Sequence, residues 1–411
     1  MAKVLTYTCP GSGHAFPPTP TAVALRDRGH DVIVRTASAS VDAIGRLGLD
    51  AASIDPRIEA IPLEDWKART SIGALVSACE TFAKRARYEV PDLQAAIEAE
   101  RPDLIWVDTN ATGAAVAAEA SGLPWAHYMP YPHPAPARGV PSFGPGFAPS
   151  NSQLARLRDA GLSALSPLAF RSFMRSHNSR RATLGLPALD GIEDLYSVAP
   201  LLVQFSAEPF EYPREWPHNV RLVGPALWEP PALEPEWLAA EDRPIVLVTA
   251  STEFQDDAKL IRVALEAFAE RPYAVIATSA AHDPADFQVP ANARVERFLP
   301  HGPLLRRAAV VISHGGMGTT QKALAAGVPV CTVPFMRDQS EVARRAEHCG
   351  GGTILRPKRL RPDRLRATVE AAIACRPGAE RIRDAFAQAG GAEAAASALE
   401  GLIADRQAAA I

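Results

Sequence analysis

Short, continuous runs of apolar residues recur along the first half of the chain and alternate with longer helical stretches. Runs at 3–8, 31–36, 103–108 and 123–128 are uninterrupted, as expected of strands that are covered on both faces. Alanine-bearing segments and single glycines separate these runs. Strand, helix, glycine and strand in this order predict parallel βαβ units.

The second half repeats this pattern, with apolar runs at 244–249, 273–277, 310–313 and 328–333. Two doubly wound α/β units in tandem, facing one another across a cleft, are the simplest architecture for such a chain. A proline-rich stretch without periodicity separates them. The sequence therefore predicts an N-terminal Rossmann-like domain over 1–215, a linker over 216–235, a second Rossmann-like domain over 236–380, and a C-terminal helix over 381–411 that packs back toward the first domain.

The composition is that of an ordinary globular protein and excludes several classes. Apolar residues make up 47% of the chain and charged residues 22%, so most of it can bury a core. A formal net charge of -3 does not favour nucleic acid as a partner. The cysteines are widely spaced, and neither a signal peptide nor an apolar stretch of roughly 18 residues is evident. We expect a cytoplasmic protein without a membrane span, and a homodimer is one open possibility.

The strongest chemical signal is a glycine-rich turn at 310–321 that joins a buried strand to a helix. The residues H-G-G-M-G, beginning at His314, let the backbone approach a ligand closely, and the N–H groups at a helix start attract an anion. A diphosphate fits this description. The spacing matches neither the P-loop nor the dinucleotide fingerprint. Taken alone, the segment could equally be a tight turn in which His314 caps a neighbouring group.

The continuation of this segment resembles the donor-binding signature of the family 1 glycosyltransferases, which have the two-domain GT-B fold and include bacterial natural-product enzymes. H-G-G-x-G-T-T at 314–320 is followed by A-x-x-x-G-V-P at 323–329 and by D-Q at 338–339. The resemblance implies that the histidine and the helix start hold the donor diphosphate, while the acid and the amide hold the sugar hydroxyls. The positions so implied are His314, Gly316, Gly318, Thr319, Thr320, Asp338 and Gln339.

Two upstream segments complete the donor site that the resemblance implies. Phe298 stands where the family has an aromatic residue that stacks on the base, and the Leu299 backbone would read the base edge. A core phenylalanine is the alternative. Ser251 or Thr252 stands in the loop where a hydroxyl meets the diphosphate, and the alternative for both is a plain turn residue.

One position departs from the family pattern. The family commonly carries a glutamate eight residues after the motif histidine, where it bonds the ribose hydroxyls, but this chain has Lys322 there. Because a lysine ammonium is a donor only, it cannot accept those hydrogen bonds. Lys322 would instead approach a phosphate or face solvent, and either outcome weakens the expectation of a uridine donor over a thymidine donor.

A histidine and an aspartate at predicted strand ends supply the reacting groups of the first half. His14 lies in the G-x-G-H turn at 11–14, at the sheet edge where doubly wound folds bind ligands. Asp108 ends another strand of the same sheet and can reach the same edge. The resemblance implies that His14 is the general base and that Asp108 orients its ring. Alternatively, His14 is structural, and Asp108 caps the next helix through Thr109-Asn110.

The less regular parts of the first half would form an acceptor pocket with apolar and aromatic walls. Its expected lining residues are Trp66, Phe82, Tyr88, Tyr128, Met129 and Phe143. Such a pocket fits a large hydrophobic acceptor better than a small sugar. The acidic pair Asp256-Asp257 lacks the intervening residue of a metal motif and lies at an expected helix start, where carboxylates are favourable. We therefore predict no metal and no cofactor.

These features predict an inverting, metal-independent hexosyltransferase. It would move a hexose from a UDP-sugar, or as second choice a dTDP-sugar, to a hydroxyl of a hydrophobic small molecule such as a polyketide, macrolide or other antibiotic. Two alternatives remain open. One is a nucleotide-sugar epimerase or hydrolase of the same fold, and the other is a non-catalytic nucleotide-sugar-binding helper protein.

Overall fold

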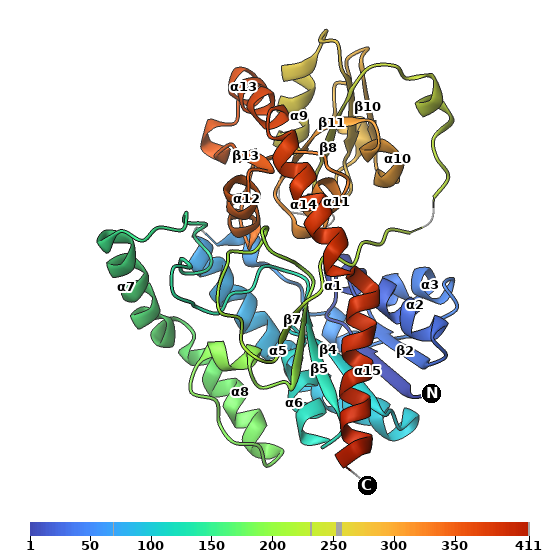
Figure 1. The fold of residues 1–411 in the computed structure, drawn as a ribbon, viewed down its shortest axis with the longest axis vertical. Helices are drawn as coiled ribbons and strands as arrows, with labels where there is room; N and C mark the ends of the chain where they lie inside the picture. The colour runs from blue at the N-terminus through green and yellow to red at the C-terminus, as the bar shows by residue number, and fades with distance from the viewer. Residues whose placement is uncertain (69, 231, 252–256, 410–411) are drawn as a thin grey trace.

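Two parallel sheets, stacked one above the other along the long axis of the molecule, form the framework of the protein (Figure 1). The computed structural model describes residues 1–411 except 69, 231, 252–256 and 410–411. Helices flank both sheets, so each domain is a doubly wound α/β unit, as the sequence predicts.

The first sheet has the strand order β3-β2-β1-β4-β5-β6-β7, and each neighbouring pair is parallel. Its strands are β1 (Lys3–Tyr7), β2 (Asp31–Thr36), β3 (Asp50–Ser53), β4 (Leu104–Asp108), β5 (Trp125–Met129), β6 (Leu201–Gln204) and β7 (Val220–Leu222). All residues of β4 and β5 are buried, which explains their uninterrupted apolar character. The strand order reverses direction between β1 and β4, which opens a crevice at the carboxyl ends of these two strands.

The second sheet repeats this plan with the order β10-β9-β8-β11-β12-β13, again parallel throughout. Its strands are β8 (Ile245–Thr249), β9 (Ala274–Thr278), β10 (Ala293–Glu296), β11 (Ala308–Ser313), β12 (Val330–Thr332) and β13 (Gly352–Ile354). The reversal here lies between β8 and β11, so the segments after these strands border the second crevice.

The helices cover both faces of each sheet. In the first domain they are α1 (Ser12–Ala15), α2 (Thr19–Asp27), α3 (Ser38–Gly45), α4 (Pro56–Glu59), η1 (Asp65–Lys67), α5 (Ser71–Glu100), α6 (Thr112–Ala120), α7 (Gln153–Ala169), α8 (Arg171–Thr183) and η2 (Ile192–Tyr196). Beyond the first sheet they are η3 (Glu236–Ala240), α9 (Ala258–Phe268), η4 (Pro284–Asp286), α10 (His301–Leu305), α11 (Met317–Ala325), α12 (Gln339–His348), η5 (Pro357–Arg359), α13 (Pro362–Ile373), α14 (Arg376–Ala389) and α15 (Gly391–Ala409). Within the described residues, no helix combines the length and apolar character that a membrane crossing requires.

The chain returns to the first domain at its C-terminus. Gly390, with φ at 87°, ends α14 in the left-handed conformation that glycine tolerates best. Beyond it, α15 lies against α2 and buries Ala395 and Leu399 in the same core cluster as Val4 of β1. Figure 1 shows this red helix beside the blue N-terminal elements. The helix therefore ties the second domain to the first.

Two element boundaries differ from the sequence-based expectation. Val220–Leu222 lie in the predicted linker at 216–235, yet they form the edge strand of the first sheet. Three residues among prolines are too short an apolar run to be recognised. The single helix predicted over 381–411 is two helices, and α14 packs on α11 in the second domain.

Candidate functional site

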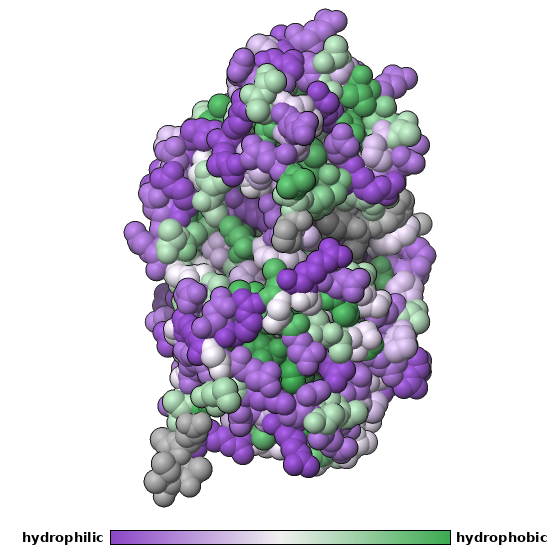
Figure 2. Space-filling view, turned by 90° about the vertical axis from the view of Figure 1, so that its right-hand side faces the viewer, coloured by the Kyte–Doolittle hydropathy of each residue, from purple (hydrophilic) through white to green (hydrophobic). Residues whose placement is uncertain are grey.

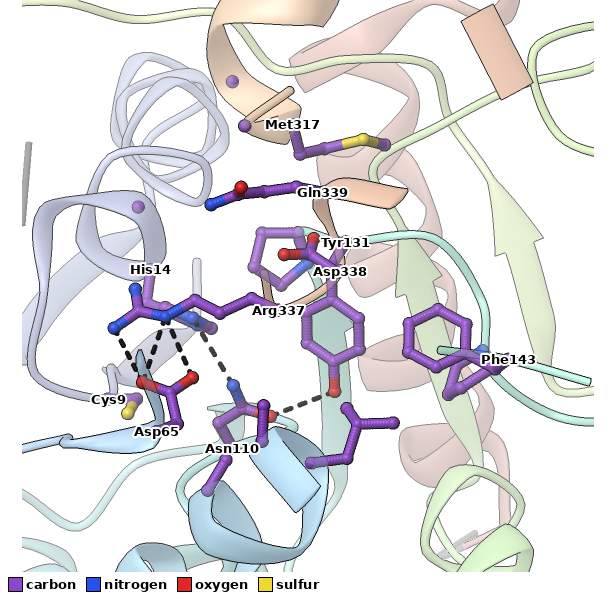
Figure 3. Close-up of a pocket in the computed structure, with 18 of the residues that line it drawn as sticks. Cys9, His14, Asp65, Asn110, Tyr131, Phe143, Met317, Arg337, Asp338 and Gln339 are labelled. Carbon is purple, nitrogen blue, oxygen red and sulfur yellow. Dashed lines mark hydrogen bonds and ion pairs between the residues drawn. The ribbon is translucent and has the colours of Figure 1, made fainter. Parts of the chain in front are cut away.

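A cleft of about 930 Å³ separates the carboxyl ends of the two sheets and is lined by residues of both domains. Figure 2 shows apolar side chains, in green, at the waist between the two halves of the molecule. In the close-up, His14, Asn110 and Tyr131 of the first domain face Met317, Asp338 and Gln339 of the second (Figure 3). The cleft thus joins the two crevices that the strand orders create.

His14 and Asp108 meet at the floor of the cleft. The His14 Nδ1 lies 2.8 Å from Asp108 Oδ2, with the carboxylate fully buried and the imidazole 24% exposed to the cleft. Gly11, at φ 117°, precedes the short helix α1 and lets the chain turn sharply after β1. Asp108 is the last residue of β4. The adjacent strands β1 and β4 therefore bring His14 and Asp108 together.

Asp108 also caps the turn that follows it, whereas the N-cap of α6 itself is Ala111, whose side chain makes no capping hydrogen bond. Its Oδ1 accepts the Asn110 backbone N–H at 2.8 Å, while its Oδ2 contacts His14. The Asn110 Nδ2 lies 3.4 Å from His14 Nε2, and the Tyr131 hydroxyl donates to Asn110 Oδ1 at 3.0 Å. Since an amide nitrogen is a donor only, this network favours the tautomer with the proton on Nδ1 and an accepting Nε2.

The glycine-rich turn after β11 forms the opposite wall of the cleft. His314, Gly316, Gly318 and Thr319 all line it, close to the start of α11 at Met317. A Cβ at Gly316 would lie 2.5 Å from the His314 Nε2, so only glycine fits between the ring and the helix start. Burial lowers the pKa of His314, and its neutral ring keeps one N–H to donate. Backbone N–H groups at a helix start suit an anion.

Asp338 and Gln339 reach the same cleft from the start of α12. The Gln339 Oε1 accepts the Phe335 and Met336 backbone N–H groups at 2.8 and 3.0 Å, which fixes the side chain. Burial raises the pKa of Asp338, while neighbouring Arg337 opposes the shift. The two side chains lie between the α11 start and His14 (Figure 3).

The remaining donor candidates differ in their placement. Phe298 lines the cleft with 54% of its surface exposed, and Leu299 behind it is almost fully buried. Ser251 also lines the cleft, with its backbone N–H donating to Asp257 at 2.7 Å. Thr252 lies outside the described residues.

Thr320 does not line the cleft, contrary to the expectation for the motif. Its side chain is completely buried, with its hydroxyl inside the body of the domain. The reason is helical geometry: residues 319 and 320 lie about 100° apart around α11, so only the former turns to the cleft.

The expected acceptor wall is only partly correct. Phe82 of α5 and Phe143 line the cleft, but four other candidates do not. Tyr128 and Met129 are fully buried in β5, and the Tyr128 hydroxyl donates to the His14 carbonyl at 3.0 Å. Tyr88 packs against the guanidinium groups of Arg57 on α4 and Arg87 on α5, and Trp66 packs against Lys67. Aromatic composition alone does not say which face of an element a side chain takes.

Several lining residues were not anticipated from the sequence. Among them are Asp65, Asn110, Phe170, Glu229 and Arg337. Leu162, Leu165 and Leu168 of α7 add apolar lining. Asn110 had one available signal, its place two residues after the strand-end aspartate. The contacts of Glu229 and Arg337 join segments far apart in the sequence, which a single sequence does not reveal.

A cluster of metal ligands is not found among the described residues: they contain no group of three or more histidine, cysteine, aspartate or glutamate side chains that could hold an ion. Charge stabilisation on the second-domain wall is available from the α11 start and from His314.

Comparisons with known proteins point to one family. The family model described as "Erythromycin biosynthesis protein CIII-like, C-terminal domain" matches residues 262–400. A 4'-demethylrebeccamycin synthase from Lentzea aerocolonigenes is 32% identical over 98% of this chain and all of its own length. An NDP-glycosyltransferase, YjiC, from Bacillus licheniformis is 26% identical over 98% of both chains. The solved structure of the calicheamicin glycosyltransferase CalG4 superposes with a TM-score of 0.77 at 21% identity, covering 98% of both chains.

Two Rossmann-like domains that face one another across a cleft, with a glycine-rich helix start on the second-domain wall, form the GT-B fold. The chain belongs to the family 1 glycosyltransferases of the bacterial natural-product type.

Proposed function

We propose that this enzyme transfers a hexose from a nucleotide diphosphate sugar to a hydroxyl group of a hydrophobic small molecule, with inversion at the anomeric carbon and without a metal ion. A UDP-sugar is the first choice of donor and a dTDP-sugar the second. One observation carries the proposal: the His14–Asp108 pair, joined at 2.8 Å, lies across the cleft from the glycine-rich start of α11.

The first domain would supply the base. His14 Nε2 takes the proton of the acceptor hydroxyl as its oxygen attacks the anomeric carbon. The bond from that carbon to the diphosphate oxygen breaks, and the diphosphate leaves with the electron pair. Asp108, fully buried, stabilises the imidazolium that forms and keeps the ring in its orientation. Attack from the wall opposite the leaving group inverts the configuration.

The second domain would hold the leaving group. The N–H groups at the α11 start, the neutral His314 ring and the hydroxyl of Ser251 or Thr252 would donate to the diphosphate, whose negative charge grows as the bond breaks. This set replaces the charge that a metal ion supplies in other enzymes. Asp338 and Gln339, between the two walls, would bind the sugar hydroxyls and set the anomeric carbon in line.

The nature of the two substrates is supported by the relatives and by the cleft. A nucleotide diphosphate donor is in the name of the Bacillus licheniformis relative. Rebeccamycin and calicheamicin, in the names of two others, point to an antibiotic aglycone. The cleft volume of about 930 Å³ lies at the upper end of small-molecule sites, and Phe82, Phe143 and the α7 leucines give it apolar walls.

Replacing the base tests the proposal. His14→Gln should lower turnover by about 10³-fold or more, because no group is left to take the proton. Affinity for the nucleoside diphosphate should stay within about twofold by calorimetry. His30→Gln, which removes a histidine that contacts Glu400 away from the cleft, is the matched control and should retain full turnover.

Three further readouts address the remaining parts of the proposal. The product should carry the opposite anomeric configuration to the donor, and a chelator should leave the rate unchanged. Incubation with donor alone should yield little free sugar or epimer. A His14→Gln enzyme with undiminished turnover would overturn the mechanism.

A further inference from the structure

Glu229 lies in the segment between the two sheets, yet its carboxylate is held by the second domain at the edge of the cleft. Its Oε1 accepts the Gly302 backbone N–H at 2.9 Å, and its Oε2 accepts the His301 N–H at 3.2 Å. The Lys322 ammonium lies 3.2 Å from the same Oε2. A Cβ at Gly302 would come within 3.3 Å of Oε1, so glycine leaves room for this close approach. The carboxylate therefore has a defined position.

Glu229 is ionised in this setting. Burial raises the pKa of its carboxyl group, but the Lys322 ammonium and the two backbone N–H groups outweigh it and hold the pKa below its usual value. A carboxylate offers about four acceptor positions on its two oxygens. The contacts from Gly302, His301 and Lys322 occupy three of them. One acceptor position on Oε1 therefore remains for a ligand, and Glu229 lines the cleft with 24% of its side chain exposed.

The location matches the ribose of a donor whose diphosphate rests on the α11 start. Lys322 is five residues beyond Met317, which places it about 7–8 Å further along the helix axis. This is comparable to the separation between a diphosphate and the ribose that it carries. Phe298, the exposed aromatic ring suited to a base, also lines the cleft and precedes His301 by three residues. Glu229 thus contacts both the segment that follows Phe298 and helix α11.

Lys322 explains why the acid comes from elsewhere. At this position the ammonium cannot accept a hydrogen bond from a ribose hydroxyl, but it can fix a carboxylate that does. The partner is 93 residues away in the sequence, in the segment that joins the domains. A simple fastening of that segment to α10 is the competing explanation, and it predicts no effect on the choice of nucleotide.

Building on the proposed function, we propose that Glu229, positioned by Lys322, accepts a hydrogen bond from a ribose hydroxyl of the donor and makes nucleotide recognition depend on the segment between the domains. The exchanged pair Lys322→Glu/Glu229→Lys would return the acid to the helix and keep the ion pair, while the Gly302 and His301 N–H groups would lose their acceptor. Lys322→Glu alone would place two carboxylates side by side and weaken nucleotide binding.

The test compares the affinities of UDP and 2',3'-dideoxyuridine diphosphate by calorimetry; dTDP and its 3'-deoxy form serve the same purpose if thymidine is the base. The wild-type enzyme should prefer the ribose form by about tenfold, and Glu229→Ala, which removes the acceptor, should bring this ratio to within about twofold of unity. The exchanged pair should restore it. Glu234→Ala is the matched control, because Glu234 lies in the same segment but pairs with exposed Arg306.

The outcomes separate this inference from the proposed function. A Glu229→Ala enzyme that is folded by circular dichroism and keeps the wild-type ratio overturns the inference alone. The inference alone is also overturned if the wild-type enzyme binds UDP or dTDP with the same affinity as the corresponding deoxy form. A wild-type enzyme that binds neither nucleotide overturns both.

Discussion

Arg337 and Asp65 form an ion pair that crosses the cleft from one domain to the other. The Arg337 Nε lies 2.9 Å from Asp65 Oδ2, and its Nη2 lies 2.9 Å from Oδ1, so the guanidinium binds the carboxylate in a bidentate manner (Figure 3). The Asp65 side chain is only 3% exposed. Arg337 has a left-handed backbone with φ at 56° and directly precedes Asp338. The pair therefore couples the approach of the two domains to the position of Asp338.

Asp65→Asn should lower kcat/KM for the donor by about tenfold, because a bidentate, charge-assisted contact of this kind contributes roughly 1–3 kcal/mol. Steady-state kinetics at varied donor concentration measure the effect. Glu64→Gln is the control: its neighbouring ion pair with Lys67 is more than half exposed on both sides, so it should change nothing. Equal rates for Asp65→Asn and the wild-type enzyme would show that the pair does not contribute to donor placement.

Asp108→Asn should reduce kcat by about 10²-fold to 10⁴-fold while the affinity for nucleoside diphosphate is retained. The new amide keeps an oxygen for the Asn110 N–H but presents an N–H to His14 Nδ1. The neutral His14 ring must then carry its proton on Nε2. A protonated Nε2 cannot take the proton of the acceptor hydroxyl. Single-turnover measurements with saturating donor test the prediction, and a kcat within threefold of wild type would contradict the proposed role.

The strands and site residues that depend on local sequence could be predicted without the structure. The run at 103–108 contains β4, and the strand ends at Tyr7 and Asp108 bring His14 and Asp108 to one edge because parallel strands share their carboxyl side. The strand β3 was not recognised, because its residues Asp50–Ser53 are small or polar. Helix α5 runs through Pro91, a residue that ordinarily marks an end.

The contacts between segments that are far apart in the sequence could not be predicted from it. Lys322 is a departure from the family pattern on sequence grounds, but its partner Glu229 is visible only in the folded chain. The same holds for Arg337 and Asp65, which are 272 residues apart. Tyr128 was assigned to the acceptor wall, whereas its ring packs in the core beneath His14. A single sequence gives the type of a side chain and the helix or strand that carries it. Tertiary packing decides whether that side chain faces the core or the cleft.

Phe143→Ala should raise the KM for the acceptor by about tenfold and leave nucleotide affinity unchanged. The ring lines the cleft, and loss of an aromatic contact of this size costs roughly 1–2 kcal/mol. The segment behind it is fixed to the second domain, because the backbone N–H groups of Gly144 and Gly146 both donate to Glu341. Phe147→Ala is the control, since that ring packs on Arg158 and does not line the cleft. An unchanged acceptor KM in Phe143→Ala would place the aglycone elsewhere.

Glu89→Gln should make the protein more stable at alkaline pH. Glu89 of α5 is fully buried, with its Oε2 accepting the Gly113 N–H at 2.8 Å. Burial raises the pKa of its carboxyl group to about 8 in the folded protein, against the contributions of Gly113 and Arg85, while the ordinary value is 4.5. The folded state therefore binds this proton more tightly than the unfolded state. The associated stability is fully present below about pH 4.5 and is lost as the pH rises through 8.

The neutral amide of Glu89→Gln removes this dependence while keeping an oxygen for the Gly113 N–H. Between pH 6 and pH 9 the variant should gain about 1–3 kcal/mol of unfolding free energy relative to the wild-type protein. Urea denaturation at the two pH values measures the difference. Glu98→Gln, on an exposed position of the same helix, is the control and should follow the wild-type profile. Parallel profiles for Glu89→Gln and the wild-type protein would mean that Glu89 is already ionised in the folded state near pH 6, with Arg85 close enough to stabilise its charge.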